Sequence, residues 1–351
     1  MEITFLVGNG FNASLGLKTS YSNFYAYLNR LMSSEEAKLK DNTIIDNIHA
    51  EFNNSNNKNA QEKRWSDLEV GLGEFTAKCK CTPEEFLEQK YEIDNLLVEF
   101  LSEEQSKFNM DEFNEKELEK YANIFRNSLV KFSDFFPPED KAIIANTIAS
   151  YGGSTKYNII DFNYTYCVDD IWDTTLLKLG DNSRAYSSFG TKIHVHGELG
   201  LSPILGVDNV EQIANTEWRQ NSSFVEMIVK EKMNKITKQD RTNQARAIIK
   251  NSAIIIVYGM SLGKTDQLWW KEIANWLVSN DKHKLIIYAH CNNRDDLIRS
   301  VYKKRKTENE YWNSFRDHTS IDEKKWQSIR NNIFIQNSAL IFDFPEIIPN
   351  K

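Results

Sequence analysis

A short glycine-containing run near the start of the chain has residue types and spacing that could hold a phosphate. It extends from Gly8 to Ala13 and reads Gly-x-Gly-x-x-Ala directly after the apolar residues 3–7. This pattern is typical of dinucleotide-binding turns, where glycines tighten the turn and let the main chain approach a pyrophosphate. A loop after any strand can also carry two glycines, so other segments must decide between the two interpretations.

Polar residues follow two further apolar runs that have the composition of strands. Asn163 and Thr165 come just after residues 157–162, and Ser261 lies in a glycine-containing loop after residues 253–258. Open α/β sheets bind ligands in the crevice outside the carboxyl ends of their strands. These residues are therefore candidates for a ligand site.

Two histidines form the third group that could do chemistry. His194 and His196 lie in residues 191–197, whose alternation predicts a short strand with both histidines on one face. Histidine suits a general base because its unperturbed pKa is about 6.5. A core or surface role is the alternative for each ring. No carboxylate or cysteine lies nearby at ligand spacing, so we predict no metal site.

The remaining apolar runs predict the elements that would position these residues. Strands alternate with helices and end in polar or glycine loops, which favours a doubly wound, Rossmann-like parallel sheet. The predicted strands are residues 3–7, 157–162, 191–197, 203–208, 253–258, 284–289 and a last one near 333–335. The predicted helices are residues 20–32 with Thr19 or Ser20 as N-cap, two within 216–250, one over 265–278 and one through the 290s.

Residues 33–150 predict a large helical insertion between the first and second strands. An asparagine-rich loop spans 52–60, and amphipathic helices are predicted over 83–107 and 110–132, before a break at 136–138. In the helix before them the apolar stripe is Trp65, Leu68, Leu72 and Phe75, and Asp67 and Glu69 lie off that stripe, where we expect them to be solvated. The predicted domains are therefore 1–32 with 151–351, an α/β domain, and 33–150, a helical insertion.

Length, charge and cysteine content limit the expected location and partners of the protein. The chain has 351 residues and a formal net charge of −7, so direct nucleic-acid binding is not expected, and the basic run 303–306 is interpreted as a solvated helix end. The start lacks a basic signal-peptide region, and no apolar run is long enough to span a bilayer. The four cysteines fit neither a disulfide framework nor a zinc site. We expect a cytoplasmic protein with reduced thiols.

Several of these short sequence motifs, in this order, resemble those of the AbiH family of bacteriophage abortive-infection proteins. The matching stretches are Gly8-Asn9-Gly10-Phe11-Asn12, residues 16–21, residues 65–69, Phe162-Asn163-Tyr164-Thr165, His194-Val195-His196-Gly197 and Tyr258-Gly259-Met260-Ser261. That family is similar in turn to the sirtuin-like NAD-binding fold. Its glycine loop, asparagine-containing strand end, His-Gly word and Gly-x-Ser loop occur in the same order.

This resemblance implies specific roles for residues of the chain. It implies that Gly8 and Gly10 contact the pyrophosphate, Asn163 the nicotinamide ribose, and Ser261 a ribose or phosphate, with His196 as the catalytic histidine. For His194 we expect a supporting or structural role. The other candidate cofactor-binding residues are Asn9, Phe11, Asn12, Thr165, Gly259 and Asp266. Asp208 and Asp266 each follow a predicted strand and are candidates for ribose hydroxyls.

The chain departs from sirtuin deacylases at two points. It lacks their four-cysteine zinc module, and Tyr164-Thr165 stands where they carry Ile-Asp. The resemblance therefore implies an anti-phage effector that hydrolyses NAD to nicotinamide and ADP-ribose, with NAD as substrate. A non-catalytic NAD or ADP-ribose sensor that signals to a partner protein is the alternative, and a deacylase the third. A homo-oligomer or a defence partner is compatible with either role.

Overall fold

The computed structural model describes residues 1–33, 42–54, 67–180, 187–201, 203–291, 293–295 and 297–345. Contacts divide the chain into two compact units. Unit 1 comprises Met1–Leu17, Lys107–Val195 and Arg241–Lys351, and unit 2 comprises Lys18–Ser106 and His196–Asp240. The expected helical insertion 33–150 is thus divided, because its part up to Ser106 falls in unit 2 and its remainder in unit 1.

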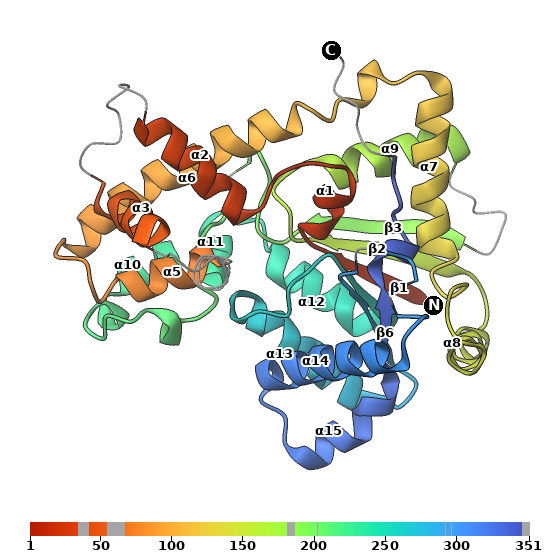
Figure 1. Ribbon diagram of the computed structural model, residues 1–351. Coiled ribbons are helices and arrows are strands. Elements are labelled where there is room, and N and C mark those ends of the chain that lie inside the picture. Colours follow the sequence, from red (N-terminus) through yellow and green to blue (C-terminus); the bar gives the residue numbers. More distant parts are fainter. Residues whose placement is uncertain are drawn as a thin grey trace. The chain divides into compact units, whose positions relative to one another are not determined.

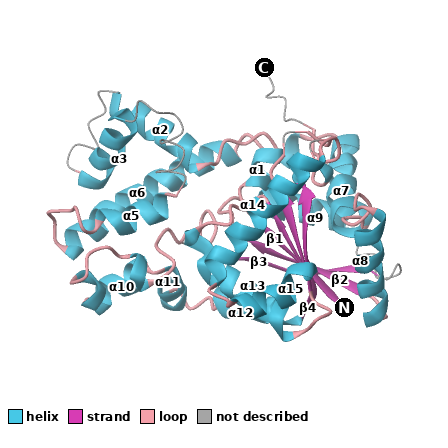
Figure 2. Cartoon of the chain, turned by 60° about the horizontal axis from the view of Figure 1, so that its bottom comes forward, coloured by secondary structure: helices cyan, strands magenta, loops and turns pink. Residues whose placement is uncertain are grey.

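Unit 1 is built on a parallel sheet in the order β3-β2-β1-β4-β5-β6, drawn as a fan of arrows in Figure 2. The strands are β1 (Glu2–Val7), β2 (Thr155–Asp161), β3 (Ser187–His194), β4 (Ser252–Tyr258), β5 (Lys284–Ala289) and β6 (Ile333–Asn337). This is the strand order of the doubly wound dinucleotide-binding fold, in which the order reverses between β1 and β4. The expected Rossmann-like parallel sheet is confirmed.

Helices cover both faces of this sheet, which is why its central strands are buried and mostly apolar (Figure 1). One face packs on α7 (Glu115–Val130), α8 (Pro138–Tyr151) and α9 (Cys167–Leu179). The other packs on α12 (Arg241–Asn251), α13 (Gln267–Ser279), α14 (Val301–Thr319) and α15 (Glu323–Ile329). The short helix α1 (Gly10–Ser14) follows β1 directly.

Unit 2 is helical in its described residues. Its helices are α2 (Tyr21–Ser33), α3 (Thr43–Asn54), α5 (Leu68–Phe75), α6 (Pro83–Gln105), α10 (Ser222–Ile228) and α11 (Lys230–Ile236). Aromatic rings form its core, where Phe86 makes edge contacts with Trp218 and Phe224. A capping box between Thr82 and Glu85 begins α6.

A buried ion pair joins the two sequence segments of unit 2. Lys230 Nζ lies 2.8 Å from Glu69 Oε2, and both side chains are buried. Tyr21 donates its hydroxyl to Glu69 Oε1 at 3.2 Å. The expectation that Glu69 is solvated is wrong, because a lysine 161 positions later in the sequence compensates its charge. Trp65, from the same predicted stripe, lies outside the described residues.

Several expected elements differ from the observed ones. Residues 203–208 form no strand apart from an isolated bridge of Val207 to Val229, and the predicted helix through the 290s begins only at Val301. Residues 52–54 of the expected asparagine-rich loop belong to α3, which continues to Asn54, and the rest of that segment lies outside the described residues. In residues 216–250 the structure has α10, α11 and α12 instead of two helices.

Two of the four cysteines are joined, contrary to the expectation of reduced thiols. Cys79 and Cys81 form a disulfide in the turn after α5, where their Cα atoms are 5.3 Å apart. The sequence spacing favoured no framework, but a turn can bring residues two positions apart together. Cys167 and Cys291 form no disulfide. Within the described residues, no helix has the length and apolarity needed to cross a membrane.

Candidate functional site

Hydrogen bonds between loops hold the carboxyl edge of four adjacent strands in unit 1. Gly10 N donates to Gly259 O at 2.8 Å, which joins the loops after β1 and β4. Asn12 and Thr165 exchange side-chain hydrogen bonds of 2.9 and 3.1 Å, which join the loops after β1 and β2. The loop after β2 is joined to the last residue of β3 by the contact of His194 with the Asn163 carbonyl. The candidate site therefore lies at the carboxyl edge of the sheet, where hydrogen bonds connect the neighbouring segments.

Asn163 is fixed by the last residue of β2. Its main-chain N–H and its side-chain Nδ2 both donate to Asp161 Oδ1, each at 2.8 Å. Asp161 is fully buried, and its Oδ2 has no hydrogen-bond partner. This contact uses one of the two Nδ2 hydrogens, so the Asn163 amide keeps its Oδ1 acceptor and one N–H donor for other contacts.

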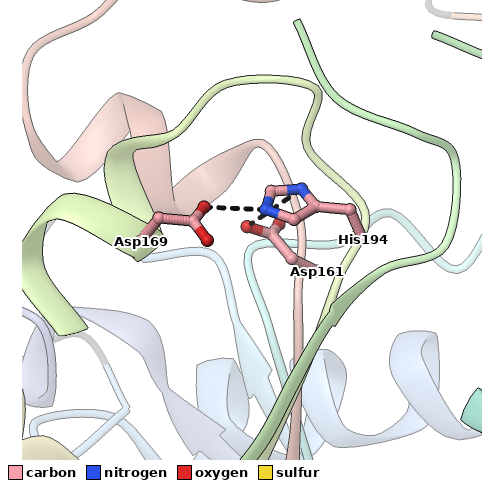
Figure 3. A group of neighbouring side chains, drawn as sticks. All are labelled: Asp161, Asp169 and His194. Atoms are coloured by element: carbon pink, nitrogen blue, oxygen red, sulfur yellow. Dashed lines mark hydrogen bonds and ion pairs between the residues drawn. The ribbon is translucent and has the colours of Figure 1, made fainter. Parts of the chain in front are cut away.

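His194 fixes the same asparagine from β3. Its Nδ1 donates to the Asn163 carbonyl at 2.9 Å. Its Nε2 donates to Asp169 Oδ2 at 2.7 Å, the contact drawn in Figure 3. A carbonyl and a carboxylate only accept, so both ring nitrogens carry a proton and the ring is an imidazolium. Parallel pairing of β2 with β3 sets Asp161 opposite His194, which explains why these two residues meet.

The charges of this group account for its titration. Burial lowers the pKa of His194, but Asp161 and Asp169 outweigh it and raise the pKa to about 9. Burial raises the pKa of Asp161 to about 6 despite the nearby His194. Burial also raises the pKa of Asp169, but His194 and Lys192 outweigh it, so the net shift is downward. Near pH 7.5 the His194 ring and the carboxyl groups of Asp161 and Asp169 are therefore charged.

Within the described residues, Asp161, Asp169 and His194 form a group that could offer ligand atoms to a metal ion. One such atom from each lies within 4.8 Å of the others. The positive charge that a cation would supply is already present, because Lys192 Nζ lies 2.7 Å from Asp169 Oδ1 and His194 is protonated. The group is therefore electrostatically satisfied by the chain itself. The absence of a metal stays a prediction.

The glycines of the first turn have a structural explanation. A Cβ on Gly8 would lie 2.6 Å from Met260 Cγ, and one on Gly10 would lie 2.4 Å from Gly259 Cα. Gly259 has a φ of 68°, a conformation that favours glycine. The N–H groups of Gly8 and Gly10 also donate within the protein, to Tyr258 O and Gly259 O. Close packing of two loops thus accounts for these residues without a pyrophosphate.

The other predicted cofactor-binding residues occupy different environments. Phe11 is fully buried among the rings of Phe125, Phe342 and Phe344, so its side chain belongs to the core. Asn12 and Thr165 are buried as a hydrogen-bonded pair. The exposed residues are Asn9 in the first loop and Ser261 in the loop after β4, and Asp266 is half-buried.

The two histidines do not share a strand face. β3 ends at His194, and His196 lies in the following turn, before Gly197 with its φ of 81°. His194 and Asn163 belong to unit 1, whereas His196 begins the second segment of unit 2. His196 is buried, and its carbonyl accepts from Ile204 N at 2.7 Å. Asp208, also in unit 2, is buried beside Gln212. The catalytic role of His196 stays a prediction.

Fold and edge together define a Rossmann-like α/β protein with polar loops at the carboxyl ends of its strands. A family model described as "Bacteriophage abortive infection AbiH" matches residues 4–288. The chain belongs to this AbiH family, which associates it with abortive infection as a defence against phage. No curated protein matches the chain.

The sequence analysis missed three residues that hold the site. Asp161 and Lys192 were predicted only as residues of the strands 157–162 and 191–197, and no element was predicted around Asp169. Asp161 carries a local signal, since an aspartate two positions before an asparagine can accept its N–H in an Asx turn. The meeting of Asp169 with Lys192 and His194 depends on the pairing of β2 with β3, for which the sequence has no local signal.

Proposed function

We propose that this AbiH protein is an NAD glycohydrolase of abortive infection, which converts NAD and water to nicotinamide, ADP-ribose and a proton. The observation that carries the proposal is the anchoring of Asn163 at the carboxyl edge of β2. Three hydrogen bonds fix its backbone and its Nδ2, which holds the amide in place with Oδ1 as a fixed acceptor. The strand order is the one that binds dinucleotides at this edge. The resemblance to sirtuin-like NAD-binding proteins supports the choice of NAD.

A rigid acceptor suits this reaction because cleavage needs orientation more than covalent help. The nicotinamide ring leaves as a neutral base while the ribose becomes oxocarbenium-like. Oδ1 of Asn163 would accept from a ribose hydroxyl and hold the sugar for attack by water. His194 and Asp161 would act as positioning residues, since they contact Asn163 and not the sugar.

The general base in this proposal is His196, which would take the proton of the attacking water or of a ribose hydroxyl. That role rests on the resemblance. Ser261 and Asn9, which are exposed in loops at the carboxyl edge, are the proposed contacts for the phosphates and the second ribose. Gly8 and Gly10 would shape these loops by packing and would not donate to a phosphate.

The test is incubation of the purified protein with NAD, followed by chromatography of nicotinamide. Asn163→Ala should lower turnover about a hundredfold, because a lost transition-state contact has that scale. Asn158→Ala is the matched control, since Asn158 is equally buried in β2 but bonds to Glu2 and Thr191 away from the carboxyl edge. Its turnover per folded molecule should be unchanged.

Two results would reject the proposed reaction. NAD binding without release of nicotinamide, in a preparation from cells under phage attack, would identify the sensing alternative. Equal turnover of Asn163→Ala and Asn158→Ala would remove Asn163 from the mechanism. His196→Ala tests the base separately, since full turnover in that variant would assign the proton transfer to another group.

A further inference from the structure

The open edge of the sheet carries a cavity that the proposed reaction does not use. β6 is the last strand of the order, so in the part of the chain that the structure describes no strand pairs with its outer edge. A cavity of about 800 Å³ lies there, lined by Ile333, Phe334 and Ile335 of β6. α8 and α14 supply most of the rest of its walls. We call this cavity the β6 groove.

The two walls of the β6 groove lie over opposite faces of the sheet. Phe334 packs in the same cluster as Ile144 of α8, whereas Ile333 and Ile335 pack in the cluster that contains Phe315 of α14. β6 therefore lies between the α8 wall and the α14 wall. A strand added to its edge would direct alternate side chains to one wall and then the other.

The walls carry opposite charge. Glu139 and Asp140 are the charged residues of the α8 wall. The other wall has Lys304 and Arg305 from α14 and Arg330 from the turn before β6, partly offset by Glu308, which lies 3.3 Å from Arg305. The pKa of Asp140 is raised, mainly by burial; the positive charge of Lys304 opposes this shift, and the negative charges of Glu308 and Glu139 add to it.

One aromatic ring organises the basic wall. The guanidinium carbons of Arg305 and Arg330 lie 5.3 and 4.7 Å from the centre of the Trp312 ring. Stacking of this kind holds the guanidinium groups in place while their N–H groups can still donate. Trp312 Nε1 donates to the carbonyl of Ile333, so a main-chain acceptor of β6 already takes a side-chain donor at this wall.

We propose that the β6 groove binds an extended peptide as an added strand, with acidic side chains toward α14 and basic side chains toward α8. Main-chain hydrogen bonds to β6 would supply affinity, and the alternation of charge would supply specificity. The occupant is thus a protein segment that alternates acidic and basic residues with period two. This site is distinct from the carboxyl edge and does not depend on the proposed NAD chemistry.

The probe is the acetylated and amidated hexapeptide Val-Lys-Glu-Lys-Glu-Val, which would span about 20 Å as a strand. Its control is Val-Lys-Lys-Glu-Glu-Val, which has the same composition and net charge but breaks the alternation. Fluorescence anisotropy should show at least tenfold tighter binding of the alternating peptide. Equal binding of the two peptides, or no binding of either, would overturn the proposal.

Two further measurements separate strand addition from general charge attraction. N-methylation of alternate main-chain nitrogens should abolish binding in one register and spare it in the other, whereas an equal effect of both would overturn strand addition. Arg305→Glu with Arg330→Glu should weaken the alternating peptide at least tenfold. Lys303→Glu with Lys306→Glu makes the same charge change on α14 outside the β6 groove and should have little effect; equal loss in both pairs would also overturn the proposal.

Discussion

The positive charge of His194 sits in a place where a lone charge would be unstable. Its side chain is 6% exposed, yet both ring nitrogens donate to oxygen and two aspartates lie beside it. Such a pair is costly to break because the remaining charge stays buried. The network therefore couples the protonation of one ring to the position of Asn163.

This coupling predicts a loss of stability at alkaline pH. The folded-state pKa of His194 is raised from 6.5 to about 9, so its contribution is fully present below pH 6.5 and is lost as pH rises through 9. The shift corresponds to at most about 3 kcal/mol. Denaturant unfolding from pH 6.5 to 9.5 should show this decline, and His194→Gln should flatten it.

His283 provides the matched control for that experiment. It is also buried, but its pKa is lowered, and its Nδ1 is 2.7 Å from the Trp276 carbonyl oxygen. His283→Gln should destabilise the protein without changing the slope above pH 6.5. If His283→Gln and His194→Gln flatten the curve equally, the network around His194 is not its source.

At the scale of elements, the loops after β1 and β4 can pack closely because glycines, which have no side chains, lie where they meet. The Cβ of an alanine at position 10 would lie 2.4 Å from Gly259 Cα, which is main chain and cannot move aside alone. Gly10→Ala should therefore lower the free energy of unfolding by about 1–3 kcal/mol, the usual cost of overpacking. Thermal unfolding measures this.

Asn9→Ala separates packing from ligand binding in the same loop. Asn9 is exposed, so its truncation should leave stability within about 0.5 kcal/mol of the parent. If Asn9 contacts the nucleotide, NAD affinity measured by calorimetry should fall nevertheless. A Gly10→Ala protein as stable as the parent would contradict the loop-packing explanation.

The sequence predicted elements best where their signal is local. β1, β4 and β5 are apolar on both faces, and their predicted bounds agree with the structure within one residue at each end. The strand expected over residues 203–208 has the same apolar composition, but those residues belong to helical unit 2. There they form no strand, and Val207 makes an isolated β-bridge with Val229. Burial against helices and burial in a sheet select the same residue types.

The candidate site was predictable only in part, for a similar reason. Asn163 follows a strand and could be selected from that position. The partners of His194 come from β2 and α9, 33 and 25 positions earlier in the chain, and only the order of the sheet brings them together. Glu69 appeared solvated because the lysine that neutralises it lies in another segment of unit 2.

At the scale of the whole molecule, unit 2 depends on a charge pair between distant segments. Lys230→Met would leave Glu69 buried without compensation, which should cost about 3–5 kcal/mol. Combining it with Glu69→Gln should recover most of that loss, because glutamine can still accept from Tyr21. Hydrogen exchange of α5 and α11 would follow both variants, and a double variant as unstable as the single one would contradict the pairing.

Membership of the AbiH family predicts a phenotype for the intact protein. Phage should form fewer plaques on bacteria that express the chain than on bacteria that carry an empty vector. Asn163→Ala should abolish this protection if it depends on the proposed cleavage, and Asn158→Ala at matched protein level should retain it. Protection that survives Asn163→Ala would separate defence from the proposed chemistry.

The strand order also constrains how the chain is made. Central β1 pairs with β2 and β4, and Glu2 finds its neighbour in β4 only when Ser252 has been synthesised. At the usual pace of translation that interval is about 12–50 s, during which the apolar residues of β1 lack one neighbouring strand. Unit 2 ends at Asp240, so all of it emerges from the ribosome before β4 can complete the core of unit 1. A nascent chain that stops before β4 lacks a neighbour of β1 and the hydrogen bond of Gly10 to Gly259, so the carboxyl edge can form its contacts only after residue 259 has been synthesised.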